Sequence, residues 1–173
     1  HIEDEINKVQ PSQHYRQSAR LFWNAGPDHS ATYAVVSPEK SGAIAEKIVG
    51  RGAAYADIDS DGDLDVLLTQ IAGPPLLLRN DQKLGLHWLR VKLRGTQANR
   101  DAIGAIVELT ADGTTQRRCV MPTRSYLSQS ELPVTIGLGN AARPDEVEIK
   151  WPSGTIQKVA DLKVDQLTTV VEN

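Results

Sequence analysis

The sequence predicts an all-β chain, because short apolar runs with a period of two residues recur along most of its length. Gly, Pro, Asn and Asp separate these runs, in the way that turns separate neighbouring strands. Regularly spaced short strands of this kind favour a sandwich or a barrel.

The first half of the chain holds one helical pattern and then five strand patterns. Residues 2–10 (IEDEINKVQ) predict a short helix that Pro11 ends. Residues 37–50 fit either a connecting loop or a weak helix. Strands are predicted at residues 19–24, 31–36, 52–57, 65–70 and 75–80.

A second block of strands starts near Leu86. Its first strand, 87–95, alternates strictly, so the pattern predicts one polar and one apolar face. The alternation sets Trp88, Arg90, Lys92 and Arg94 against Leu89, Val91 and Leu93. Further strands are predicted at 105–111, 114–121, 133–139, 146–151, 155–160 and 167–172.

Between the two blocks, residues 80–85 are polar and end in glycine, as a module boundary does. We therefore predict two modules, residues 1–82 and residues 83–173.

Composition excludes several classes of protein. The net charge is only −3, and no Lys/Arg run carries interleaved aromatic residues, so we expect no nucleic-acid partner. No apolar stretch approaches the roughly 20 residues that span a bilayer. The single cysteine, Cys119, allows no intramolecular disulfide. Because the chain opens with His1 and shows no signal peptide, we interpret it as part of a longer protein with its targeting segment upstream.

The strongest feature of the sequence is an acidic loop with carboxylates at alternate positions and a glycine, Gly62, at its sixth position. Calcium takes six to eight hard oxygen ligands in flexible geometry, and glycine permits the sharp reversal that brings late ligands back to early ones. We expect side-chain oxygens from four of the aspartates, the backbone carbonyl of Asp63, and water to complete the shell. The predicted Ca²⁺ ligands are Asp57, Asp59, Asp61, Asp63 and Asp65.

The acidic pattern of the loop is also compatible with three other kinds of site or turn. An EF-hand needs a bidentate acid at position 12 and flanking helices, but position 12 is Leu68 and the flanks predict strands. Magnesium demands compact octahedral geometry and keeps its waters, so it is disfavoured. The loop could also be an acidic surface turn that holds no metal.

The sequence around this loop, RGAAYADIDSDGDLDVLLTQ followed by GPPLLLRND, resembles a β-propeller repeat of the FG-GAP/VCBS type. Further along, HWLRVKLRGTQANRDAIGAIVELTADG, SYLSQSE, IGLG and VEIKWPSGTIQ resemble the ASPIC/UnbV domain. Both together resemble the C-terminal end of the cartilage acidic protein family, found in secreted animal proteins and in bacterial relatives. The resemblance implies terminal propeller blade(s) with a calcium loop in residues 1–82, followed by an antiparallel β-sandwich in residues 83–173. It implies metal ligands at the five loop aspartates and no catalytic residue.

A propeller typically needs four to eight blades, and this chain holds strands for one blade or parts of two. Such a fragment exposes strand edges, so self-association through a blade edge is expected as one behaviour of the isolated chain.

From these observations we expect an extracellular or periplasmic, calcium-stabilised interaction module that binds a protein or a glycan and is not an enzyme. The alternative is a calcium-dependent carbohydrate-binding module. Its sugar platform would be built from exposed tryptophans among Trp23, Trp88 and Trp151, residues that otherwise serve as core anchors with the indole N–H bonded nearby.

Overall fold

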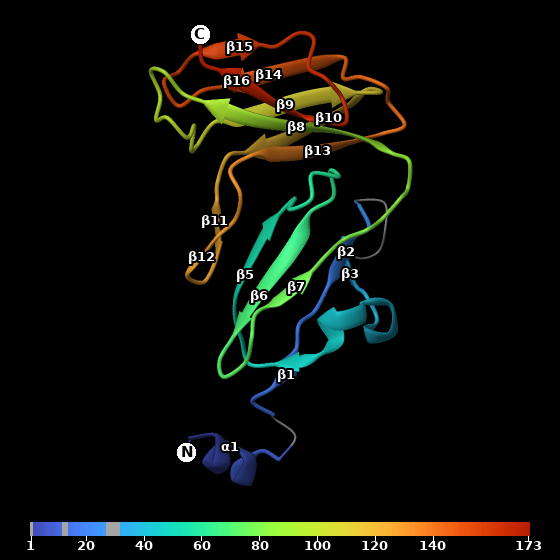
Figure 1. Cartoon of the computed structure of the whole chain (residues 1–173), viewed down its shortest axis with the longest axis vertical. Coiled ribbons are helices and arrows are strands. Elements are labelled where there is room, and N and C mark those ends of the chain that lie inside the picture. Colours follow the sequence, from blue (N-terminus) through green and yellow to red (C-terminus); the bar gives the residue numbers. More distant parts are fainter. Residues whose placement is uncertain (1, 12–13, 27–31) are drawn as a thin grey trace. The chain divides into compact units, whose positions relative to one another are not determined.

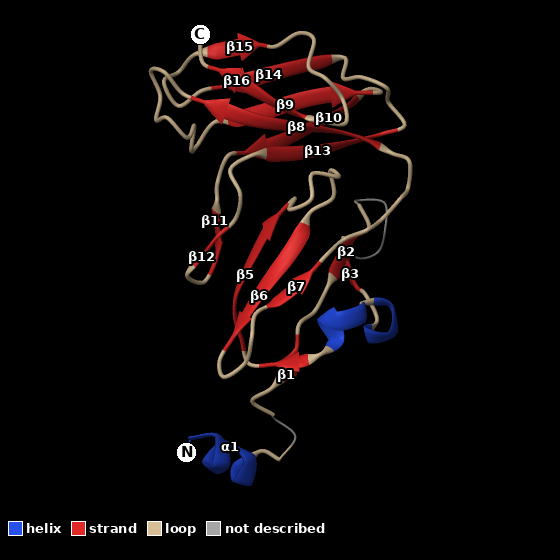
Figure 2. Cartoon of the chain, viewed as in Figure 1, coloured by secondary structure: helices blue, strands red, loops and turns tan. Residues whose placement is uncertain are grey.

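The computed structural model of the protein describes residues 2–11, 14–26 and 32–173 (Figure 1). Strands dominate these residues, as Figure 2 shows, and the predicted all-β class is confirmed. Several separate sheets form, and none of those in the described part of the chain closes on itself.

The chain divides into two compact units, and the division crosses two strands that flank the acidic loop. The first unit comprises residues 1–53 and 67–78, and the second comprises residues 54–66 and 79–173. The acidic loop therefore belongs to the second unit. The division into a 1–82 and an 83–173 module stays a prediction.

The first unit opens with the predicted helix, α1 (Ile2–Val9), which ends before Pro11. The segment 37–50 is predicted as either a loop or a weak helix. It contains two 3₁₀ turns, η1 (Pro38–Lys40) and η2 (Gly42–Ala45), and then strand residues at 47–48 and 50. Two short strand pairs, β1–β4 and β2–β3, accompany most of a three-stranded sheet with the order β5-β6-β7, of which residues 54–56 and 65–66 belong to the second unit. The strands are β1 (Gln17–Ser18), β2 (Phe22–Asn24), β3 (Tyr33–Val35), β4 (Lys47–Ile48), β5 (Gly50–Ala56), β6 (Asp65–Gln70) and β7 (Leu76–Leu78).

All five strand predictions for this region overlap an observed strand, although β2, β3 and β7 are shorter than predicted and β5 begins two residues earlier. The two-residue strands β1 and β4 were not predicted. Ala31, the first residue of one predicted strand, lies outside the described residues. Whether the β5-β6-β7 sheet is part of a propeller blade stays a prediction.

The second unit is built on two larger sheets and one short hairpin. The sheet orders are β10-β9-β14-β15 and β13-β8-β16, and β11 pairs with β12. The strands are β8 (His87–Arg94), β9 (Ile106–Ala111), β10 (Thr114–Cys119), β11 (Thr123–Ser125), β12 (Ser128–Gln129), β13 (Val134–Gly139), β14 (Glu146–Lys150), β15 (Ile156–Lys158) and β16 (Leu167–Val171).

One hydrophobic core joins these two sheets. Residues alternate between buried and more exposed along β9 and β13, as the period-two pattern predicts. The inward side chains of both sheets form a single cluster whose largest fully buried members are Leu89, Ile136, Leu109 and Ile149. Each such residue contributes roughly 1.5–3 kcal/mol of hydrophobic stabilisation. The core therefore holds β8 firmly in the middle of its sheet.

The prediction of a wholly antiparallel sandwich is wrong for one strand pair. β16 pairs with β8 in parallel, from Leu167 beside Arg90 to Val171 beside Arg94. Parallel neighbours need a crossover connection rather than a hairpin. β16 comes last in the chain and joins the free edge of β8, so its direction is not set by a local turn that the sequence displays.

Candidate metal centre

The acidic loop connects β5 to β6, and both flanking strands are as predicted. Leu68, at position 12 of the loop pattern, lies inside β6, so the EF-hand interpretation is excluded. Two loop residues have left-handed backbone conformations, Ser60 with φ 65° and Gly62 with φ 95°. These conformations turn the chain sharply within the loop.

Gly62 also lies against the indole of Trp88, which comes from β8. A Cβ atom at position 62 would lie 2.1 Å from Trp88 Cε2 and 2.2 Å from Nε1. Glycine is thus required twice here, for its backbone conformation and for the space beside the ring. The loop thus packs, through Gly62, against the β13-β8-β16 sheet of its own unit.

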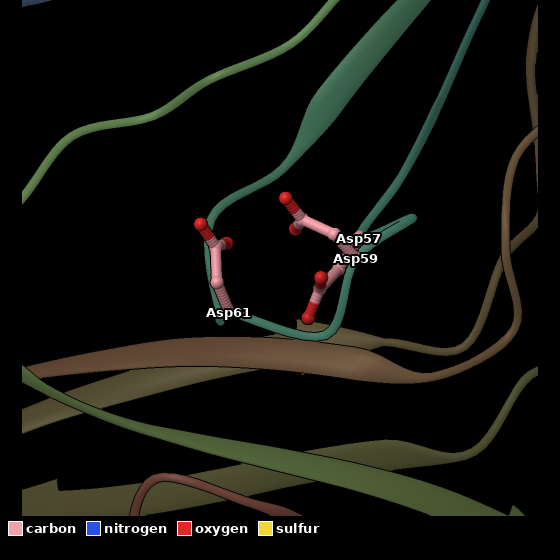
Figure 3. Close-up of side chains that lie close together, drawn as sticks. All are labelled: Asp57, Asp59 and Asp61. Carbon is pink, nitrogen blue, oxygen red and sulfur yellow. The ribbon is translucent and has the colours of Figure 1, made fainter.

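Three of the five loop carboxylates come together. Oxygen atoms of Asp57, Asp59 and Asp61 all lie within 4.8 Å of one another, and Figure 3 shows the three side chains clustered inside the loop. Asp57 is buried, whereas Asp59 and Asp61 are exposed. The cluster therefore has a buried end and an open end.

The buried end supplies the test of whether a cation fits this loop. Asp57 Oδ2 accepts hydrogen bonds from Arg90 Nη1 at 2.7 Å and from the Gly62 N–H at 3.1 Å. Asp57 Oδ1 is buried and has no hydrogen-bond partner among the residues that the structure describes. A buried acceptor left without a partner costs about 1–3 kcal/mol, and more when it is charged. An oxygen-seeking cation bound between the three carboxylates removes that cost, so the residues present fit a hard cation such as calcium.

Asp65 and Asp63 do not join this group of three. Asp65 is almost fully buried, and its two oxygens accept the N–H groups of Ile58 at 2.9 Å and Asn80 at 2.8 Å. It therefore fastens the start of the loop to its end and to the chain that follows β7. Burial, followed by the charges of the other loop aspartates, raises the pKa of Asp63. Their roles as ligands stay predictions.

The sequence did not reveal two residues that contact the loop, Arg90 and Glu131. Arg90 lies on the predicted polar face of β8, but the loop covers this face at Arg90, and the residue is only 5% exposed. Its Nη2 forms an ion pair with Glu131, and the Asp57 N–H also approaches Glu131 Oε2, at 3.4 Å. Burial raises the pKa of Glu131, an effect that Arg90 opposes. No spacing rule links residues 57, 90 and 131, so a single sequence gave no signal of this contact.

The three tryptophans have different environments. Trp151 is 3% exposed and its indole N–H donates to Gln157 Oε1 at 2.9 Å, so it is a core anchor and not a sugar platform. Trp88 is partly buried and packs on Gly62. Trp23 in β2 is 59% exposed.

Comparison with known proteins finds a family match in the C-terminal part of the chain. Residues 95–173 match the family model described as ASPIC and UnbV, which confirms that part of the expected resemblance. The matched region begins just after β8, although β8 is the middle strand of one of the two sheets.

The chain is also similar to cartilage acidic protein 1 from three animals. It is 32% identical to the Xenopus tropicalis protein over 127 residues, which are 70% of this chain and 19% of that protein. It is 34% identical over 109 residues, 61% of this chain, to the proteins of Mus musculus and Homo sapiens, of which it covers 17% and 16%. The chain thus spans less than a fifth of the length of these relatives.

Within the described part of the chain, no helix has the length and apolar character needed to cross a membrane.

Proposed function

We propose that this chain is a calcium-binding interaction module in which the ion is structural and not catalytic. The observation that supports the proposal most strongly is the Asp57 carboxylate, which lies beside those of Asp59 and Asp61 and whose buried Oδ1 has no hydrogen-bond partner in the described part of the chain. The donors are all hard oxygens on a loop between two strands, which suits calcium's flexible coordination.

The ion's effect on stability follows from the charge of the loop. Repulsion between clustered carboxylates opposes the folded loop, and a bound divalent cation removes this repulsion. A ligand that binds only the folded state stabilises it by about 2.7 kcal/mol at 100 times its dissociation constant. Because Gly62 of the loop packs on Trp88, an ordered loop also orders the surface of the sandwich sheet beside it.

We further propose that β5, β6 and β7 belong to an FG-GAP/VCBS-type propeller blade in an extracellular or periplasmic protein. Support comes from the DxDxDG loop between adjacent strands of one sheet and from the much greater length of the animal relatives. The outer strands of this sheet, β5 and β7, offer open edges for self-association. Light scattering tests this self-association: a molar mass that stays monomeric at every protein concentration contradicts it.

A glycan partner is the second candidate, because an open concavity of about 520 Å³ lies beside the loop. Such a volume is in the range of small-ligand sites, roughly 300–1,000 Å³. Its lining combines the Trp88 ring with the amides of Asn80 and Gln82 and the carboxylates of Asp61 and Asp63. Calcium-dependent binding on a glycan array, lost in Gln82→Ala, favours this function. Binding that is indifferent to calcium and to Gln82→Ala contradicts it.

The test of the calcium proposal is thermal unfolding in calcium and in a chelator. We expect calcium to raise the Tm of the wild-type chain and to have little effect on Asp59→Ala. The matched control is Asp145→Ala, which removes an exposed carboxylate outside the loop and should keep the full calcium response. Equal responses in all three proteins contradict the proposal.

A further inference from the structure

Arg90 joins two buried carboxylates that come from distant parts of the sequence. Its side chain is 6% exposed, and the side chains of Asp57 and Glu131 are 0% and 11% exposed. Nη1 donates to Asp57 Oδ2 at 2.7 Å, and Nη2 pairs with Glu131 and lies 3.5 Å from the Asp57 carbonyl oxygen. A planar guanidinium is suited to holding two acceptors in fixed directions at once.

The two carboxylate oxygens of Asp57 consequently differ in their hydrogen bonding. Oδ2 accepts from Arg90 and from the Gly62 N–H, while Oδ1 is buried and has no hydrogen-bond partner among the described residues. An oxygen of this carboxylate lies within 4.8 Å of oxygens of Asp59 and Asp61. We propose that Arg90 is the positioning residue of the cation site, and that it holds Asp57 so that Oδ1 remains available as a ligand. This inference rests on the proposed cation-binding function and names a residue outside the loop that sets its affinity.

Arg90 is itself held rigidly. It lies in β8, the central strand of its sheet, with Thr135 of β13 on one side and Leu167 of β16 on the other. Glu131 is fixed to the end of β5, because its N–H donates to the Tyr55 carbonyl at 3.1 Å while Ser130 Oγ accepts the Tyr55 N–H at 3.2 Å. The guanidinium is therefore anchored from its backbone and from its second carboxylate.

A positive charge so close to a cation site also has an opposing effect. Coulomb repulsion between Arg90 and a bound divalent cation lowers affinity, so charge alone predicts tighter binding once Arg90 is neutralised. Positioning predicts the reverse, because a released Asp57 carboxylate no longer presents Oδ1 to the loop. The two effects differ in sign, and a charge-conserving Arg90→Lys variant separates them further, since lysine keeps the charge but not the planar fork.

The experiment measures cation binding to the whole chain by terbium(III) luminescence, with calcium as competitor. Trp88 packs on Gly62 and serves as the sensitising indole. The variants are Arg90→Lys and Arg90→Gln, each shown to be folded by circular dichroism. The matched controls are Arg94→Lys and Arg94→Gln, which change an exposed arginine of the same strand.

We expect both Arg90 variants to weaken calcium binding about tenfold or more, as removal of an outer-sphere partner of a ligand does. For both Arg90 variants, terbium luminescence lifetimes in H₂O and D₂O should show one more water bound to the ion than in the wild type, because a water takes the place of the Asp57 oxygen. The Arg94 variants should match the wild type in both readouts. If Arg90→Gln is unfolded, Arg90→Lys decides alone.

The outcomes separate the inference from the function on which it rests. If a folded Arg90 variant binds calcium as tightly as the wild type or more tightly, with no additional water on the ion, the positioning role is overturned and the cation site stands. A wild-type chain that binds neither ion overturns the proposed function, and the inference with it.

Discussion

Replacement of Gly62 by alanine tests whether the acidic loop depends on the ring of Trp88. The new Cβ would lie 2.1 Å from Trp88 Cε2, far inside contact distance, and the backbone φ of 95° is strained for any residue with a side chain. The strained conformation costs about 1–3 kcal/mol, and forced overpacking costs about 1–3 kcal/mol more. We therefore expect Gly62→Ala to lower the free energy of unfolding by about 2–6 kcal/mol.

Gly104 provides a close control for this measurement. Its φ is 93°, and an added Cβ would meet only Pro152 Cγ, at an ordinary contact distance of 3.7 Å. Gly104→Ala should therefore show only the conformational cost, about 1–3 kcal/mol. Urea unfolding in the presence of a chelator measures the free energy of unfolding of both variants. The two values are comparable when the m-values are equal. Equal destabilisation by the two substitutions would refute the packing of the loop on Trp88.

Three further predictions concern charge and burial in the second unit. In the presence of a chelator, Arg90→Met should lower the free energy of unfolding by about 3–5 kcal/mol, because it leaves the carboxylates of Asp57 and Glu131 buried without the guanidinium that pairs with them. A decrease below about 1 kcal/mol in urea unfolding contradicts the burial of this ion pair. Burial raises the pKa of Glu172, but hydrogen bonds from the Ser153 hydroxyl and from three backbone N–H groups outweigh it and lower the pKa from 4.5 to about 2. Because the folded-state pKa is depressed, the stabilisation is present above pH 4.5 and is lost as the pH falls toward 2, so wild type and Glu172→Gln should converge in that window; a constant difference in Tm argues against these bonds. Trp151→Ala should cost about 3–5 kcal/mol and leave the calcium affinity of the loop unchanged in titration calorimetry, and a selective loss of affinity contradicts its role in the core.

The sequence was sufficient for the longer strands and for the loop between β5 and β6, but it missed the short strands β1, β4, β11 and β12. The cation chemistry of the loop stays a prediction. Period-two alternation in β8 and β9 reflects the two faces of a half-buried sheet, so it was readable without a structure. Carboxylates at alternate positions around Gly62 likewise identify a candidate cation loop from local spacing alone.

The relations that the sequence did not reveal are all long-range. Arg90 fits the polar face of β8, and only the folded structure shows that the loop contacts and covers this residue. The contact of Trp88 with Gly62 is also visible only in the folded structure, because it joins a residue of the sheet to a residue of the loop. The parallel pairing of β16 with β8 depends on which sheet edge is free, and strand spacing carries no information on this. Local patterns predict elements, whereas contacts between distant elements require the fold.

The most direct test of the calcium site is a crystal structure of the chain grown in millimolar calcium. We predict one ion at about 2.4 Å from oxygens of Asp57, Asp59 and Asp61, the distance typical of calcium ligands. Asp57 Oδ1 should be a ligand, while Oδ2 stays with Arg90. A well-ordered loop without an ion among these carboxylates, or an ion bound elsewhere while Oδ1 stays unliganded, would contradict the account.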